Sequence, residues 1–312
     1  MTLVNAAATT DRVRLALSSS GHHRRGRAFK YALLASLLIS LAVLVILVGQ
    51  VLATGWPVFV DRGPGFLSAG LSGNPETAGV WQALKGTFWI GVIVIVVAFP
   101  NGVAAAIYLE EYAKDTRLNR FINVNIRNLA GVPSIVYGIL GFTIFVEAMG
   151  GLTGGISVIA GGVTLAVLVL PIVIITSMEA LRAVPNSIRE AGYGVGATRW
   201  EVIRSHVLPY AAPGLLTGTV LSLARALGEA APLILVGAKT GFFSLPGSAS
   251  FVEELTGPFT ALPITIYDWS RKPGEGWQEL AAAAIIVILV VTLTANTVAI
   301  LLRNRYDKKR SA

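Results

Sequence analysis

The residues best suited to chemistry in this sequence are an arginine and a glutamate four positions apart within a long apolar run. Arg225 and Glu229 lie in the run 213–238, and on a helix they would share one face. Ser222 falls on nearly the same stripe. A charged side chain inside a membrane is costly and normally faces an aqueous path or a partner. The pair predicts a cationic binding site for an anion, which we call the anion station. The alternative is that the two charges only neutralise each other and hold the helices together.

A polar insert between two apolar runs is the second candidate. Ser187–Glu190 and Thr198–Glu201 both have the spacing of a capping box, which starts a helix. Three glycines between them predict breaks: Gly192, Gly194 and Gly196. Two short helices joined by a glycine turn form a shape suited to docking another protein. The alternatives are a passive helical connector and a DNA-reading helix-turn-helix, which the nearby membrane runs disfavour.

Composition predicts the elements that hold these residues. The chain is 54% hydrophobic and 13% charged, whereas soluble domains carry about 25% charged residues. Six runs reach the length of about 20 residues that a membrane-spanning helix needs. Because lipid offers no hydrogen-bond partner, the backbone N–H and C=O groups of each run must pair within the run, as they do in a helix. We therefore predict an all-α integral membrane protein with six transmembrane helices, at approximately 31–54, 86–109, 128–146, 156–178, 213–238 and 281–302.

The placement of Lys and Arg predicts the orientation of these helices. There are six basic residues before Tyr31, four in 110–127, four in 179–212 and five at the C-terminus, against five on the other side of the membrane. Basic residues favour the cytoplasm. This predicts a cytoplasmic tail at 1–30, a transmembrane domain at 31–305 with a cytoplasmic loop at 179–212, and a cytoplasmic tail at 306–312. The net charge of +8 reflects this topology, and the basic tail favours contact with lipid headgroups over nucleic acid.

Several finer features are also predicted. The short link at 150–155 makes the third and fourth runs an antiparallel hairpin, in which Gly161 and Gly162 allow close helix packing. The loop at 239–277 is long enough for a short amphipathic or re-entrant segment, for example near Phe251–Leu255. Four tryptophans near the ends of runs are predicted to anchor the membrane interface: Trp56, Trp81, Trp269 and Trp277.

Missing motifs exclude several kinds of enzyme. The chain has no Gly-x4-Gly-Lys-[Ser/Thr], no Gly-x-Ser-x-Gly, no His-Glu-x-x-His and no cysteine. We predict no catalytic residue, no metal site and no cofactor bound by this chain, so that any ATP must be bound by another chain. A secondary carrier would need inverted repeats and more carboxylates within its helices.

Several motifs resemble one known family. The segments 106–113 (AIYLEEYA), 131–138 (GVPSIVYG) and 225–233 (RALGEAAPL) resemble those of phosphate ABC importer permeases. The polar insert is similar to the EAA loop of ABC importer permeases, with matches at Glu190, Ala191, Gly196, Leu208 and Pro209, and departures at Gly192 and His206. The similarity covers roughly 31–305, and the ending Glu-Ala-Ala-Pro-Leu resembles the PstA-type subunit.

The resemblance implies a type I ABC importer permease fold in a bacterial cytoplasmic membrane. It implies a permease subunit for inorganic phosphate, paired with a PstC-type permease, two ATP-binding subunits that use the ATP, and an external phosphate-binding protein. The pathway residues would be Arg225, Glu229 and Ser222. The residues that couple to the ATPases would be Glu190, Ala191, Gly192, Gly196, Leu208 and Pro209. A permease for sulfate or molybdate remains open, because an arginine suits any oxyanion.

Overall fold

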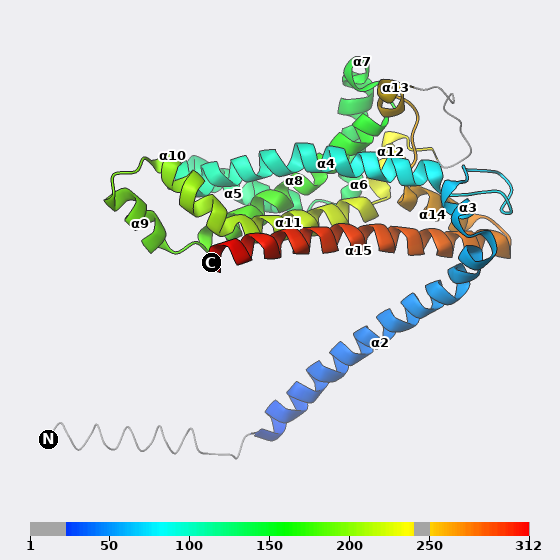
Figure 1. Cartoon of the computed structure of the whole chain (residues 1–312), viewed down its shortest axis with the longest axis horizontal. Coiled ribbons are helices and arrows are strands. Elements are labelled where there is room, and N and C mark those ends of the chain that lie inside the picture. Colours follow the sequence, from blue (N-terminus) through cyan, green and yellow to red (C-terminus); the bar gives the residue numbers. More distant parts are fainter. Residues whose placement is uncertain (1–22, 240–249, 312) are drawn as a thin grey trace. The chain divides into compact units, whose positions relative to one another are not determined.

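The computed structural model describes residues 23–239 and 250–311, and every regular element within these ranges is a helix (Figure 1). The chain divides into two compact units, residues 1–53 and 54–312. Five helices are long and apolar enough to cross a membrane, and a sixth span results if one bent helix pair is counted as a single span. The all-α membrane fold is thus confirmed. Predictions for residues 1–22 and 240–249 lie outside the described residues.

The described part of the first unit belongs to α2, which begins at His23 and ends at Arg62 in the second unit. Every residue from Gly26 to Gln50 is exposed, and those after Lys30 are almost all apolar. A helix that is apolar on all sides suits direct contact with lipid. This agrees with the first predicted run.

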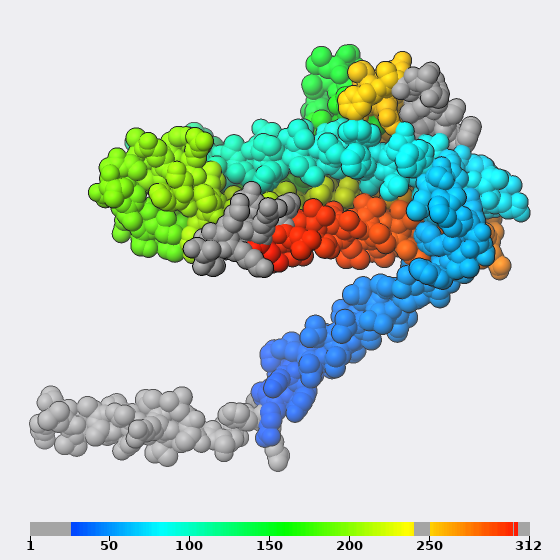
Figure 2. All heavy atoms as spheres, in the orientation of Figure 1, coloured from blue at the N-terminus to red at the C-terminus, as the bar shows by residue number. Residues whose placement is uncertain are grey.

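Four long helices form the body of the second unit, side by side in Figure 1: α4 (Trp81–Ile107), α8 (Val158–Arg182), α11 (Leu208–Gly228) and α15 (Glu275–Ser311). Helix α8 packs on both α4 and α11, and more than half of its residues are buried. In the view of Figure 2, α4 (cyan) and α15 (orange to red) face the viewer along the body of this unit. Glycine allows the close packing of α4 on α8, since a Cβ at Gly162 would lie 2.8 Å from Ile93.

The third predicted run is not one straight helix. The structure has α5 (Arg117–Ala130), then α6 (Ser134–Gly141), which continues as the π-helical segment η3 (Phe142–Ala148). A bend of 100° separates α5 from α6–η3. Pro133 causes the bend, because it lacks an N–H and disfavours helical geometry at Val132. The Tyr137 hydroxyl donates to the carbonyl of Leu129 across the bend, at 2.9 Å.

The fifth predicted run is also broken. Helix α11 ends at Gly228, Glu229 has extended geometry with φ −83° and ψ 116°, and α12 begins at Ala231 and ends at Val236. Pro232 occupies the first turn of α12, where its missing N–H costs no helical hydrogen bond. The prediction of one uninterrupted helix through Glu229 was therefore wrong.

The second unit also contains the short helices α3 (Pro64–Ser68), α7 (Gly150–Thr153), α13 (Phe251–Thr256) and α14 (Leu262–Arg271). Helix α13 occupies the part of the 239–277 loop where a short amphipathic or re-entrant segment was suggested. Two of the predicted interface tryptophans, Trp269 and Trp277, are instead buried against each other with ring centroids 6.0 Å apart. Trp56 and Trp81 are exposed, as interface anchors would be.

The segment before α14 is fastened tightly to α4. The Thr87 hydroxyl accepts a hydrogen bond from the backbone N–H of Leu262 at 2.8 Å. One residue earlier, a Cβ at Gly86 would lie 1.9 Å from the carbonyl oxygen of Thr260. Only glycine can therefore occupy position 86 without moving this segment.

Candidate functional site

Arg225 and Glu229 lie together at the end of α11. Arg225 Nε is 3.8 Å from Glu229 Oε1, although Glu229 has already left the helix. The Arg225 side chain is 54% exposed and the Glu229 side chain 22%. A separation of 3.8 Å is too long for a hydrogen bond. The guanidinium makes no hydrogen bond to the residues that the structure describes.

Ser222 lies three residues before Arg225 on α11 and differs from it in burial. Its side chain is buried, and its hydroxyl donates to the carbonyl of Gly218 at 2.9 Å. Gly218 in turn packs against Thr176 of α8. Arg225 and Glu229 thus lie close to each other with part of each side chain exposed, whereas Ser222 is buried, and the role of all three in a pathway stays a prediction.

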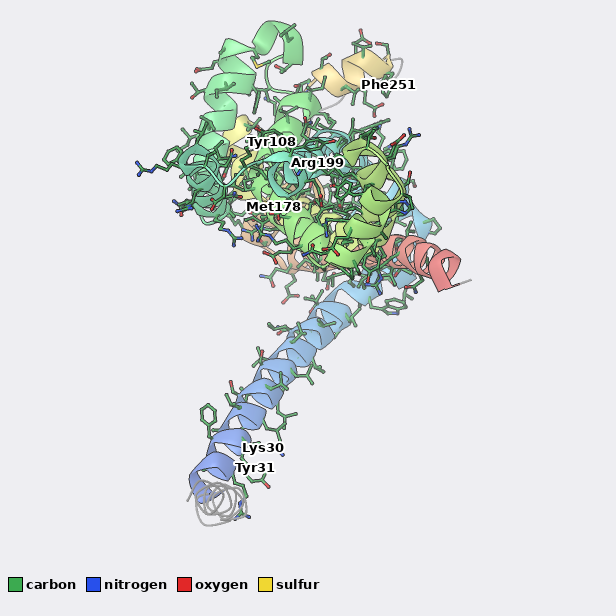
Figure 3. The ribbon with its side chains drawn as sticks, turned by 90° about the vertical axis from the view of Figure 1, so that its left-hand side faces the viewer. Lys30, Tyr31, Tyr108, Met178, Arg199 and Phe251 are labelled. Carbon is green, nitrogen blue, oxygen red and sulfur yellow. The ribbon has the colours of Figure 1, made fainter. Side chains whose placement is uncertain are left out.

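The polar insert folds into α9 (Asn186–Gly194) and α10 (Arg199–Val202), followed by the π-helical segment η4 (Ile203–Val207) that leads into α11. Figure 3 looks onto this end of the bundle, with Arg199 labelled. The N–H of Gly196 donates to the carbonyl of Tyr193, and the N–H of Ala197 donates to that of Gly192. This pair of bonds is a Schellman motif, and Gly196 supplies its left-handed residue, with φ +83°.

Only one of the two predicted capping boxes is formed. The Thr198 hydroxyl accepts from the N–H of Glu201, and the N–H of Thr198 donates to the Glu201 carboxylate at 2.7 Å. Ser187 makes no such box, because Pro185 precedes the helix and α9 already begins at Asn186.

Of the three glycines predicted as breaks, only Gly196 is one. Gly192 and Gly194 lie within α9. Gly192 is buried, and a Cβ there would lie 2.7 Å from Val202. Gly192 therefore serves the packing of α9 against the start of the next helix, and the chain turns at Gly196.

The loop presents an exposed surface of mixed character. Among the predicted coupling residues, Glu190, Ala191, Gly196 and Pro209 are exposed, Leu208 is partly buried and Gly192 is buried. Three large apolar side chains are exposed beside them: Tyr193, Val195 (84% exposed) and Trp200. Exposed apolar patches are typical of protein or membrane interaction sites and of ligand grooves.

Sequence reasoning missed a group of contacts where α4 meets this loop. Glu110 and Glu111 lie in the π-helical segment that follows α4, and they pair with Arg182 and Arg189, at 2.6 and 2.7 Å. The sequence signal for these ion pairs was the presence of two adjacent glutamates in one segment predicted to be cytoplasmic and of four basic residues in the 179–212 loop. The basic residues served only to predict orientation, and the partners, more than 70 positions apart, could not be matched.

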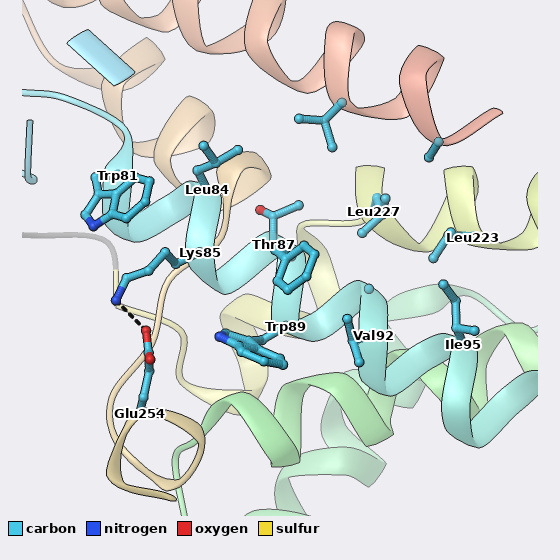
Figure 4. A pocket seen from close by; sticks show the side chains of 14 residues that line it. Trp81, Leu84, Lys85, Thr87, Trp89, Val92, Ile95, Leu223, Leu227 and Glu254 are labelled. Atoms are coloured by element: carbon cyan, nitrogen blue, oxygen red, sulfur yellow. Dashed lines mark hydrogen bonds and ion pairs between the residues drawn. The ribbon is translucent and has the colours of Figure 1, made fainter. Parts of the chain in front are cut away.

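A separate groove of about 690 Å³ lies between α4, α11 and α15 (Figure 4). Leu223 and Leu227 line it from α11, and its other walls are mostly apolar. Lys85 and Glu254, the charged residues among its described lining, form an ion pair with each other. With its charges paired, the groove offers an anion no site comparable to Arg225.

Comparison with known proteins places the chain in a family. Residues 98–311 match the family described as "Binding-protein-dependent transport system inner membrane component". The "Phosphate transport system permease protein PstA" of Yersinia pestis is 36% identical over 241 residues, which are 76% of each chain. The "Phosphate transport system permease protein PstA 1" of Mycobacterium tuberculosis is 34% identical over 279 residues, 88% of this chain and 87% of that protein.

Solved structures share the fold at lower identity. A chain of the MetNI methionine ABC transporter superposes with a TM-score of 0.53 at 19% identity, covering 73% of this chain and 94% of that one. A chain of a bacterial alginate ABC transporter gives 0.59 at 14% identity, covering 89% and 96%. The protein is a multi-pass membrane protein and belongs to the family of inner membrane components of binding-protein-dependent transport systems.

Proposed function

We propose that this chain is a transmembrane permease subunit of an ATP-driven importer of inorganic phosphate. The observation that carries the proposal is the exposed guanidinium of Arg225 at the end of α11, beside Glu229. The relatives named for phosphate transport, which match most of the chain, support the same substrate over sulfate or molybdate.

The arrangement suits a station that binds an anion weakly. A guanidinium offers two parallel N–H donors to two oxygens of one phosphate. Glu229 lies close enough to orient Arg225, and its negative charge limits how tightly an anion is held. Weak binding is what a transport site requires, because the ion must leave again on the other side of the membrane.

The remaining parts of the transporter are other chains. We infer a second permease of the PstC type, two ATP-binding subunits in the cytoplasm and an external phosphate-binding protein. The ATP-binding subunits would use the ATP and would dock on the loop of α9 and α10. Support for this surface comes from the exposed Glu190 and Ala191 and from the apolar side chains Tyr193, Val195 and Trp200.

The substrate is tested with a panel of oxyanions. The assembled complex is placed in vesicles, and uptake of radiolabelled phosphate, sulfate and molybdate is measured with the binding protein loaded with each ion. Phosphate should be imported with ATP present and the other two far more slowly. Preferential import of sulfate or molybdate would end the proposal for phosphate, and ATP-independent uptake would favour a secondary carrier.

We further propose that both termini and the α9–α10 loop are cytoplasmic. The basic residues of the loop and of the C-terminal tail support this orientation. Reporter fusions after Asn74 and after Gly274 should read as external, and a fusion after Trp200 as cytoplasmic. A cytoplasmic signal after Gly274 would contradict the orientation and the docking of ATPases on the loop.

A change at Gly196 should weaken the coupling of ATP hydrolysis to transport. Valine is strained at φ +83°, at a cost of about 1–3 kcal/mol, so Gly196→Val should distort the Schellman turn and reduce copurification of the ATPase. Gly196→Asn is the matched control, since asparagine tolerates this geometry and should retain most coupling. Glu190→Lys, which reverses an exposed charge, should act like the valine variant. Full ATP-driven uptake by both Gly196→Val and Glu190→Lys would make the loop a passive connector.

A further inference from the structure

The last turn of α4 continues as a π-helical segment, η2 (Tyr108–Tyr112), which ends where Ala113 becomes extended. Three consecutive side chains of η2 contact three arginines from different parts of the chain between 182 and 199. Tyr108 of η2 and Arg199 of α10 are both labelled in the end-on view of Figure 3. The α9–α10 loop, called the docking loop below, is thus connected to α4 as well as to α8 and α11, its neighbours in sequence.

The first contact fixes the end of α8. Arg182 donates from Nε to Glu110 Oε2 at 2.9 Å and from Nη2 to Glu110 Oε1 at 2.6 Å. Two parallel N–H···O bonds set the orientation as well as the distance of the two groups. The last residue of α8 is thereby held to η2.

The second contact joins η2 to α9 and is the most buried. Arg189 Nη2 donates to Glu111 Oε1 at 2.7 Å, and the two side chains are 17% and 6% exposed. Arg189 also donates to the carbonyls of Leu181 and Val184 at the end of α8, at 2.9 and 2.7 Å. One guanidinium therefore ties α9, α8 and η2 together. Separating this pair would leave an uncompensated buried charge, which makes it costly for the three elements to come apart.

The third contact reaches α10. The guanidinium of Arg199 lies over the ring of Tyr112, 5.0 Å from its centroid. This distance is within the range of cation–π attraction. Both side chains are exposed, so this contact can be altered with little disturbance to the core.

We propose that η2 is the link through which movement of the docking loop reaches α4, and that Glu111 and Arg189 are positioning residues for this coupling. The inference rests on the proposed function, since it assigns a path for the movement that ATP hydrolysis drives. A displacement of α9 pulls on Glu111 and hence on α4, which packs along the length of α8. Proximity alone does not establish such a path, so the test must measure coupling directly.

The readout is the factor by which loaded external binding protein stimulates ATP hydrolysis in the assembled complex. Glu111→Gln keeps the shape of the side chain and removes its charge. We expect the stimulation to fall by about tenfold, within the 5–150-fold range of coupling between sites, with the complex assembled and basal hydrolysis retained. Arg189→Lys should act in the same direction, because one ammonium cannot serve the carboxylate and both carbonyls with the geometry of the guanidinium fork.

Two further variants keep the test decisive if Glu111→Gln fails to fold. Tyr112→Leu should lower the stimulation and Tyr112→Phe should preserve it, since phenylalanine retains the ring that faces Arg199. Asp115→Asn is the matched control for loss of an acidic charge. Asp115 pairs with Arg120 at 3.1 Å, the two side chains are 83% and 70% exposed, and the pair lies outside the loop contacts.

An assembled Glu111→Gln complex with unmodified stimulation would overturn the link, as would equal stimulation in Tyr112→Leu and Tyr112→Phe. The proposed function fails separately. Uptake of phosphate by the unmodified complex tests the substrate, whereas the stimulation factor can be measured with whichever ion the binding protein carries.

Discussion

Replacing Arg225 with glutamine is expected to abolish phosphate uptake while the transporter still assembles. A hydrogen bond to a charged group is worth about 1.5–3 kcal/mol. Losing a two-pronged contact should therefore slow the initial rate by at least about a hundredfold. The side chain is 54% exposed, so its removal should disturb packing little. The measurement is the initial rate of radiolabelled phosphate uptake into vesicles, with copurification of the ATPase as the control for assembly.

The lysine variant separates charge from shape. Arg225→Lys keeps a positive charge but offers a single ammonium in place of a planar fork. Uptake should fall well below that of the unmodified protein and stay above that of the glutamine variant. Uptake equal to the unmodified protein would mean that charge alone acts at this position.

A double variant distinguishes the station from simple neutralisation. If Glu229 only balances the charge of Arg225, replacing both with leucine should restore the uptake that either single replacement loses. An anion station predicts that the double variant assembles and moves no phosphate. Normal uptake of phosphate by the double variant would contradict the hypothesis that Arg225 binds the anion.

Replacing Gly86 with alanine should have the largest effect on stability. The new Cβ would lie 1.9 Å from the carbonyl oxygen of Thr260. That oxygen cannot easily retreat, because Thr260 is buried and Leu262 is held by its hydrogen bond to Thr87. Overpacking costs about 1–3 kcal/mol and occasionally more, and we expect at least the upper end here. The thermal unfolding midpoint of the detergent-solubilised protein measures the effect.

Gly65→Ala is the control for this substitution. Gly65 is exposed in α3, and a Cβ there would meet nothing within 4 Å. Its unfolding midpoint should stay close to that of the unmodified protein. If Gly86→Ala also kept that midpoint, the segment around Thr260 would be free to move, contrary to the packing described.

The spanning helices could be predicted because their signal is local. The runs that became α4, α8 and α15 are long, apolar and almost free of charge, and lipid permits such runs little besides a helix. The breaks near Pro133 and at Glu229 were missed for a different reason. A proline inside a membrane helix can be accommodated or can end it, depending on what the neighbouring helices offer to the freed backbone groups. Here Tyr137 supports the bend by bonding to Leu129.

In the candidate site, too, local patterns could be predicted and long-range contacts could not. Arg225 and Glu229 were found because ionisable residues stand out in an apolar run, and the Thr198 capping box because its partners are three residues apart. Ser187 has the same local pattern, yet α9 begins at Asn186, two residues too early for Ser187 to act as its cap. The partners of Glu111 could not be predicted, since the Arg189 contact spans 78 positions and depends on how α8 and α9 fold back.

The contact between Thr87 and Leu262 has a consequence for synthesis of the protein. The two residues are 175 positions apart. At a translation rate of about 5–20 residues per second, roughly 10–35 s separate their appearance. Throughout that interval the face of α4 around Gly86 lacks the segment that covers it. A chain cut short before Thr260 lacks this cover altogether, so the face of α4 around Gly86 stays open.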